Sequence, residues 1–306
     1  MSEHFTGHPK MGWLPDYPSI QDYTPQKDTV STKLKALDQK PIKAMLTEAK
    51  AATPTVDLRA TGDLRAWCSP IENQGSIGSC TAHAGVGLAE YFERRASGRH
   101  LDASRLFLYK VTRDLLHWTG DTGAFLRSAM EALALFGTPP EEYWPYVVAD
   151  YDKEPSQFCF AFAQSYQAIT YYRLDPQGIS RPDLLARIKT NISSGLPSMF
   201  GFTVYQSYGQ TNSNGGRFPL PTSAEKVVGG HAVDAVGYDD TLKIKNATPG
   251  GPETTGALLI RNSWGTGWGE SGYGWLPYEY VLKGLATDWW SILKTEWIDT
   301  GNFGPD

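Results

Sequence analysis

The sequence predicts an α+β protein whose first half is helical and whose second half consists mainly of strands. In the first half, apolar residues recur at intervals of three and four. In the second half, β-branched and aromatic runs are bounded by Gly, Pro or Asn. At 306 residues the chain can bury a substantial core. We expect an N-terminal extension at 1–52 and a folded domain at 53–306, with helices at about 53–170 and strands at about 171–300.

The longest expected helix begins at Cys80 and ends before Gly98. Its apolar positions follow one helix face: Ala84, Leu88, Tyr91 and Phe92. Ser79 is a candidate N-cap, and a glycine directly after the last turn is a common stop signal. This helix is expected to be central to the fold.

Further elements follow from the same two patterns. Helical spacing occurs in residues 104–117, 124–136 and 181–195. Ser104 is a candidate cap for the first of these helices, and Gly137 ends the second. Strand-like runs occupy residues 197–205, 231–240 and 257–264.

The extension differs in composition from the rest of the chain. Residues 12–26 are rich in Pro and aromatic residues and should be extended. Residues 31–51 are rich in Lys and Ala and weakly helical, with an interruption at Pro41. Two interpretations stay open: an ordered extension or tag-like tail, and a segment that lies across the body and covers a site.

Charge and hydropathy exclude several partners. The 28 basic and 33 acidic residues give a net charge of -5, which does not support binding to nucleic acid or to anionic membranes. No apolar run approaches the roughly 18 residues of a membrane span. The first residues lack the charged and apolar regions of a secretory signal, so we expect a cytoplasmic protein or export by a signal-independent route.

Three cysteines, Cys68, Cys80 and Cys159, cannot all pair within one chain. One disulfide between Cys68 and Cys159 is conceivable, but free thiols are the favoured expectation. The sequence contains no cluster of metal-ligating residues at a familiar spacing. We therefore expect no cofactor and no metal.

Cys80 is the candidate nucleophile. At the first turn of a helix, a thiol faces unpaired amides and the positive end of the helix dipole, which favour its thiolate. Gly75 and Gly78 leave the backbone around it uncrowded, and Gln74 can supply an amide donor. The alternative is a small buried hydrophobe, the ordinary role of a free cysteine.

A cysteine nucleophile needs a base and a group that orients the base. His231 follows two glycines at the start of a strand, where it can point into a cleft, although a histidine there is often structural. Asn262 ends a later strand and can hold one imidazole nitrogen, with Trp264 covering that bond from water. The glycines at 265, 267 and 269 superficially match a phosphate-binding loop, but no helix is expected after them, so we reject that reading.

Together these motifs resemble the papain-like cysteine peptidases, and more closely the bacterial members. The resemblance rests on Gln74 to Cys80, on the GHAV around His231 and on the NSWGTGWGESGY that begins at Asn262, and it covers about residues 55–300. It implies a two-lobe fold with a helical N-terminal lobe, an antiparallel β-barrel-like C-terminal lobe and an active-site cleft between them. It also implies catalytic roles for Cys80, His231, Asn262 and Gln74.

The resemblance further implies substrate-binding positions. Residues 120–123 resemble the cleft wall that pairs with the substrate backbone through Gly123, and Phe125 lies near the second specificity pocket. Gly230 and Trp264 are the other implied positions. The chain departs from the family pattern at Ile77, where a half-cystine is usual, and at Thr81, where an aromatic residue is usual. The rigidity of this loop must then depend on packing.

The expected function is a cysteine endopeptidase that acts through a thiolate–imidazolium pair and an acyl-enzyme intermediate. Its expected partners are polypeptide substrates, with neither nucleic acid nor membrane, and its own N-terminal segment over the cleft. Two alternatives stay open. One is a catalytically silent or binding-only homologue, and the other is an acyl transferase or deamidase of the same fold.

Overall fold

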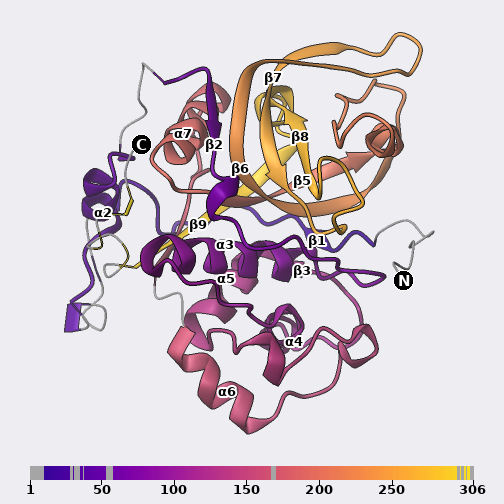
Figure 1. The fold of residues 1–306 in the computed structure, drawn as a ribbon. Helices are drawn as coiled ribbons and strands as arrows, with labels where there is room; N and C mark the ends of the chain where they lie inside the picture. The colour runs from indigo at the N-terminus through magenta and orange to yellow at the C-terminus, as the bar shows by residue number, and fades with distance from the viewer. Residues whose placement is uncertain are drawn as a thin grey trace.

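The computed structural model describes residues 10–27, 30, 35–36, 38–52, 58–166, 170–294, 297, 300 and 302–303. It has two lobes. Helices of the first half form the lower part of Figure 1, and the strands of the second half form the sheet above them. The α+β architecture expected from the sequence is confirmed. The predicted domain boundaries adjoin residues 53–57 and 167–169, which lie outside the described part.

The helical lobe contains four α-helices: α3 (Cys80–Ser97), α4 (Arg105–Leu115), α5 (Leu126–Leu135) and α6 (Gln157–Ala163). Gly98 ends α3 with a φ of 72°, a left-handed conformation that glycine adopts without strain. The Ser104 side chain accepts the amide of Phe107 and caps α4 as expected. Ser79 precedes α3, but its hydroxyl hydrogen-bonds the Tyr146 hydroxyl at 2.6 Å and caps no amide.

The other lobe is a seven-stranded antiparallel sheet in which β2 (Thr61–Asp63) pairs with β6. The order along the remaining path is β4 (Thr170–Arg173), β9 (Ala286–Leu293), β5 (Ser198–Tyr205), β6 (Val227–Lys245), β7 (Glu253–Arg261) and β8 (Tyr273–Pro277). Among the described residues this path does not close. The expected barrel-like lobe is therefore an open sheet.

Shorter elements complete the β lobe and its connections. Helix α7 (Arg181–Ser193) lies beside β2 and β6 in Figure 1, and α8 (Tyr278–Leu282) follows β8. Short 3₁₀ helices lie at Arg65–Trp67, Glu141–Tyr143, Val148–Asp150, Gln164–Tyr166 and Gln206–Asn212.

Two expectations about the helical half are wrong in detail. The helix expected at 124–136 begins at Leu126, because Ala124–Phe125 form the short strand β3. Strand β2 lies in a region expected to be mostly helical, yet its pairing with β6 places it in the β lobe. Neither strand shows a clear period-two pattern, since one has three residues and the other two.

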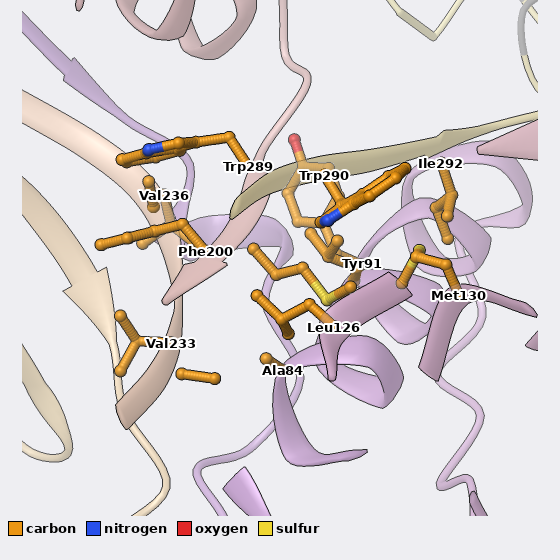
Figure 2. Packing of buried hydrophobic residues seen from close by; sticks show 14 of the residues in the cluster. Ala84, Tyr91, Leu126, Met130, Phe200, Val233, Val236, Trp289, Trp290 and Ile292 are labelled. Atoms are coloured by element: carbon orange, nitrogen blue, oxygen red, sulfur yellow. The ribbon is translucent and has the colours of Figure 1, made fainter. Parts of the chain in front are cut away.

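The core lies where α3 and α5 pack against the sheet. Figure 2 shows Ala84, Tyr91, Leu126 and Met130 from the helices facing Phe200, Trp289, Trp290 and Ile292 from the strands. The rings of Phe200 and Trp289 stack with centroids 3.9 Å apart. This packing joins the two lobes, so the residues along their seam are fixed relative to one another.

The described part of the extension contacts the body in two places. Strand β1 (Trp13–Leu14) pairs in parallel with β3 between the two lobes, as Figure 1 shows. Helix α2 (Ile42–Glu48) begins directly after Pro41, and the side chains of Met45 and Leu46 are fully buried. In the part of the chain that the structure describes, no helix combines the length and apolarity needed to cross a membrane.

Candidate active site

Cys80 is the first residue of α3 and is completely buried. Burial raises the pKa of its thiol to about 11, although backbone hydrogen bonds from Ala232 and Gly12 favour the charged form. One of these partners adjoins His231 on β6, and the other belongs to the N-terminal extension. The thiol therefore lies at the seam between the lobes with a peptide group of the extension against it.

His231 and Asn262 meet across neighbouring strands of the sheet. The Nε2 atom of His231 lies 2.8 Å from Oδ1 of Asn262. Trp264 stacks on the imidazole with ring centroids 4.7 Å apart, so it shields that hydrogen bond from water. The remaining ring nitrogen, Nδ1, is buried and has no hydrogen-bond partner among the described residues. The arrangement matches the one expected from the sequence.

Burial works against the expected thiolate–imidazolium pair, which stays a prediction. Burial lowers the pKa of His231 to about 4, while the hydrogen bond with Asn262 works in the opposite direction. Burial therefore disfavours the charged form of both groups while the site is covered. The backbone of Gly12 lies against the thiol, and Trp264 lies on the imidazole, so both contribute to this burial.

Gln74 is held by five hydrogen bonds, one of them from its backbone amide to the carbonyl oxygen of Ser263 at 2.9 Å. Its Nε2 donates to the carbonyl oxygens of Lys10 at 2.9 Å and Ile77 at 3.0 Å. The Ser263 hydroxyl donates to Oε1 at 2.7 Å, and the Tyr146 hydroxyl donates to the Gln74 carbonyl at 2.9 Å. Sequence reasoning missed both hydroxyls. Ser263 directly follows Asn262 and could have been found there, whereas no local pattern identifies Tyr146.

The loop before Cys80 is ordered without a disulfide. All three cysteines are free. The amide of Gly78 donates to Oδ1 of Asp121 at 2.8 Å, and the Tyr109 hydroxyl donates to the same oxygen at 2.5 Å. Asp121 therefore joins the nucleophile loop to the neighbouring cleft wall. This carboxylate supplies part of the rigidity that the departure at Ile77 leaves to packing.

Residues 10–13 cross the cleft over these groups. The Lys10 ammonium pairs with Oδ2 of Asp121 at 2.5 Å, and the carbonyl of Gly12 accepts the amide of Ala124 at 2.9 Å. A Cβ on Gly123 would lie 2.2 Å from that carbonyl oxygen, so only glycine permits the approach. Gly123 also has a φ of 73°.

The other expected substrate-binding residues lie along the same cleft. A Cβ on Gly230 would lie 2.5 Å from the Trp13 carbonyl oxygen. Phe125 is opposite Leu14 in the β1–β3 pair, and its ring lies 5.5 Å from that of Trp118. Their roles toward a substrate stay predictions. Within the described residues, no three or more His, Cys, Asp or Glu side chains cluster as metal ligands would.

Comparison with known proteins gives a consistent result. The sequence model described as "Papain family cysteine protease" matches residues 52–287. A peptidase C1-like protein of Acanthamoeba polyphaga mimivirus is 30% identical over 293 residues, which are 93% of this chain and 90% of that protein. The crystal structure of xylellain, a cysteine protease from Xylella fastidiosa, is similar to this structure with a TM-score of 0.70. The two sequences are 31% identical, and the match covers 93% of this chain and 96% of that chain.

A more distant structure supports the fold alone. The cysteine protease of Carica candamarcensis in complex with E-64 has a TM-score of 0.55 and 24% identity. The match covers 78% of this chain and 99% of that chain.

Proposed function

The chain belongs to the papain family of cysteine proteases, and we propose that it hydrolyses peptide bonds with Cys80 as nucleophile and His231 as the proton-transfer group. One observation carries the proposal. The backbone of the extension already lies on the nucleophile and on the proposed oxyanion donor, with Gly12 against the Cys80 thiol and the Lys10 carbonyl on the Gln74 amide. A polypeptide backbone therefore fits this site.

In the proposed reaction, the proton of the Cys80 thiol passes to Nδ1 of His231 once the cleft is open to water. The thiolate attacks the carbonyl carbon of the substrate, and its electrons move onto the carbonyl oxygen. Imidazolium His231 then gives its proton to the leaving amine. A water molecule, deprotonated by His231, attacks the acyl-enzyme and releases the acid and the free thiol.

Gln74 and the backbone amide of Cys80 would stabilise the oxyanion. One such donor generally contributes about 3 kcal/mol to transition-state binding. Ser263 supports this role, since its hydroxyl donates a hydrogen bond to Oε1 of Gln74 and so fixes the orientation of the amide, with Nε2 on the side of the extension. Asn262 holds Nε2 of His231 and leaves Nδ1 for the thiol. Both are positioning residues.

Residues 10–13 would act as a cover that keeps the peptidase closed. Their parallel pairing with β3, their hydrogen bond from Gln74 and the burial of Cys80 all support this role. The burial that disfavours the charged forms of the thiol and the imidazole supports it as well, because a neutral thiol is a poor nucleophile.

The test is covalent labelling with E-64, the inhibitor bound to the Carica candamarcensis protease, followed by intact mass measurement and peptide hydrolysis. The full chain should label slowly, and Trp13→Ala, which loosens the cover, should label faster with one adduct at Cys80. Cys80→Ala should lose both labelling and turnover. The matched control is Cys159→Ala, which removes another buried free cysteine and should keep both.

The alternatives predict other results. A binding-only homologue would give no adduct in any of these proteins. An acyl transferase would pass the acyl group to an added amine in preference to water. Full turnover by Cys80→Ala would refute the assignment of the nucleophile.

A further inference from the structure

The peptide group between Ile77 and Gly78 lies between the proposed oxyanion donor and the cleft wall. Its carbonyl oxygen, on Ile77, accepts Nε2 of Gln74 at 3.0 Å. Its amide, on Gly78, donates to Oδ1 of Asp121 at 2.8 Å. The carbonyl and the N–H of one peptide group share a plane, so a contact that fixes one also fixes the other. Asp121 therefore acts on Gln74 through a rigid peptide plane.

This peptide group becomes more important once the cleft is open. In the covered state, Nε2 of Gln74 also donates to the Lys10 carbonyl oxygen at 2.9 Å, and a substrate oxygen would replace that carbonyl. Two contacts then remain on the side-chain amide: the Ser263 hydroxyl on Oε1 and the Ile77 carbonyl on Nε2. A donor stabilises an oxyanion best when it is held in advance where the charge develops. One of the two supports of Gln74 is therefore the peptide group that Asp121 holds.

The carboxylate of Asp121 divides its two oxygens between the body and the cover. Oδ1 accepts the Gly78 amide and the Tyr109 hydroxyl, the latter at 2.5 Å. Oδ2 accepts the Lys10 ammonium at 2.5 Å. Burial by itself would raise the pKa of Asp121, but the hydrogen bonds from these three donors outweigh it and hold the pKa below its usual range. Departure of the cover removes only the contact of Oδ2, so Oδ1 still supports the loop in the open enzyme.

Helix α4 fixes the wall that carries this carboxylate. The Tyr109 hydroxyl accepts the amide of Gly123 at 3.1 Å, and the Tyr109 ring centroid lies 4.1 Å from Cζ of Arg113. Arg113 pairs with Asp152 at 2.6 Å, and Asp152 accepts the amide of Gly120 at 2.8 Å. Both ends of the wall are thereby tied to buried side chains one turn apart on α4. The carboxylate between these ends is a fixed anchor for the nucleophile loop.

The structure assigns to Asp121 the role of a positioning residue in catalysis: it holds the Ile77–Gly78 peptide so that Gln74 presents its amide to the oxyanion. This inference rests on the proposed peptidase function. The loop has no half-cystine at position 77, and one carboxylate oxygen with two donors ties it to the wall instead. Because the oxyanion forms only in the transition state, loss of this contact should lower kcat and leave KM nearly unchanged.

The first experiment separates the position of the carboxylate oxygen from its charge. All variants are made in the full-length double variant Lys10→Met/Trp13→Ala, in which the cover is loosened and its ion pair with Asp121 is absent. Asp121→Asn keeps an acceptor oxygen for Gly78 and Tyr109, so kcat for a fluorogenic peptide should stay within about threefold. Asp121→Glu keeps the charge but moves the carboxylate by one methylene, and Asp121→Ala removes it. Both should lower kcat about thirtyfold and change KM less than about threefold.

Alkylation by iodoacetamide shows whether the loss is specific to the oxyanion. This reagent reacts with the Cys80 sulfur by displacement of iodide, and no carbonyl oxygen gains charge. In the same background, Asp121→Ala should be alkylated at Cys80 within about twofold of the parent rate, measured by peptide mapping, although its kcat is much lower. A general disturbance of the loop would slow both reactions. Equal losses in alkylation and turnover would therefore overturn the inference.

Gln74→Ala tests whether Asp121 acts through Gln74. In protein that already lacks the Gln74 amide, Asp121→Ala should lower kcat less than about threefold, because no side-chain donor is left to misplace. Equal factors with and without Gln74 would contradict the assignment. Asp114→Ala removes a surface carboxylate paired with Lys110, and this matched control should keep kcat.

If Asp121→Ala does not fold, the opposite outcomes expected for Asp121→Asn and Asp121→Glu still decide the matter. A low kcat in folded Asp121→Asn, or an unchanged kcat in Asp121→Glu, would overturn the inference. Turnover that does not depend on Asp121 would refute only the positioning role. No turnover and no E-64 adduct at Cys80 in the parent double variant would refute the proposed function instead.

Discussion

Two pieces of the N-terminal extension contact the body by different physical means. At the front, residues 10–23 rely on ion pairs and on one aromatic side chain, Trp13, that enters a slot lined by glycines of β5 and β6. At the back, α2 contributes Met45 and Leu46, whose side chains are fully buried in the core. Polar contacts can be exchanged for water, whereas buried apolar side chains cannot leave without exposing the core. The front buries one apolar side chain, Trp13, besides its polar contacts and is the piece better suited to release, whereas the back is part of the fold.

Because α2 is part of the fold, the predicted boundary at residue 52 does not separate the cover from the body. A cut there would remove α2 together with the cover. We infer that release of the cover without damage requires opening or cleavage between the front piece and α2. The predictions below test this division, from the largest expected effect to the smallest.

Leu46→Ala should destabilise the protein without activating it. Removal of a fully buried leucine side chain costs about 3 kcal/mol of unfolding free energy, because a cavity remains. Urea unfolding gives the stability, and E-64 labelling of Cys80 gives the state of the cover. Ile20→Ala, at a side chain that is 98% exposed, should change stability by less than about 0.5 kcal/mol. If Leu46→Ala labelled faster in native buffer with unchanged stability, helix α2 would act as part of the cover, and the proposed division between front and back would be wrong.

Acidification should lower the free energy of unfolding through two buried histidines, His231 and His83. Burial lowers the pKa of His231 to about 4 and that of His83 to about 3. Each neutral histidine gives stability that is full above the unfolded pKa near 6.5 and is lost as the pH falls toward the folded value. Asp288 has the opposite effect on the free energy of unfolding. Burial raises its pKa to about 6, so its protonation stabilises the folded state as the pH falls below that value.

Together these three groups should lower the free energy of unfolding by about 2 kcal/mol between pH 7 and pH 5, measured by urea unfolding. Asp234, whose pKa is also raised by burial, opposes this loss. His83→Gln should show a smaller drop over the same interval, whatever its stability at pH 7. A flat profile in the unmodified protein would show that burial of the two histidines does not control its acid response.

Arg127→Ala should loosen the front piece. Arg127 pairs with Asp16 and Asp22 and donates to the carbonyl oxygen of Tyr17, so one side chain gathers three residues of the extension. Its loss should raise the E-64 labelling rate about tenfold, which corresponds to about 1.4 kcal/mol. Arg99→Ala, at an exposed arginine after α3, is the control and should label like the unmodified chain. Equal rates for the two variants would mean that the cover is held elsewhere.

Lys10→Met should have the smallest effect. The Lys10 side chain is 49% exposed, and exposed ion pairs contribute at most about 1 kcal/mol. We expect about a threefold faster E-64 labelling at low salt and no difference at 1 M salt, where the pair is screened. Lys153→Met, which removes a comparable surface pair with Asp150, should not alter labelling at either salt concentration.

The sequence predicted the long elements and the hydrogen bond between His231 and Asn262 because both leave local patterns. The stripe of α3, its Gly98 stop and the strand that precedes Asn262 each depend on neighbouring residues. The contacts of Asp288 and Tyr146 could not be predicted, since one depends on a bulge in β9 and the other on a side chain that reaches Gln74 across 72 residues. The sequence predicts a helix from residue 124 because the apolar residues of the two-residue strand β3 continue the pattern of α5.

The covered cleft likewise escaped a firm prediction. Residues 12–26 show no periodicity, and their position depends on a slot that exists only after β5 and β6 have paired. The protonation of Cys80 and His231 could not be predicted for the same reason, because it depends on burial that only the folded structure shows. A helix N-terminus favours the thiolate, but burial raises the pKa of the thiol.

The loop that carries Cys80 owes its order to hydrogen bonds with Asp121 and to the packing of Gln74, and all three sulfurs are unbridged. Its shape therefore does not depend on the redox potential of its surroundings. Millimolar dithiothreitol can protect the nucleophile from oxidation during purification and assay without opening a structural crosslink. Loss of activity after exposure to peroxide should be attributed first to the chemistry of the Cys80 sulfur, and its recovery on reduction should not require refolding.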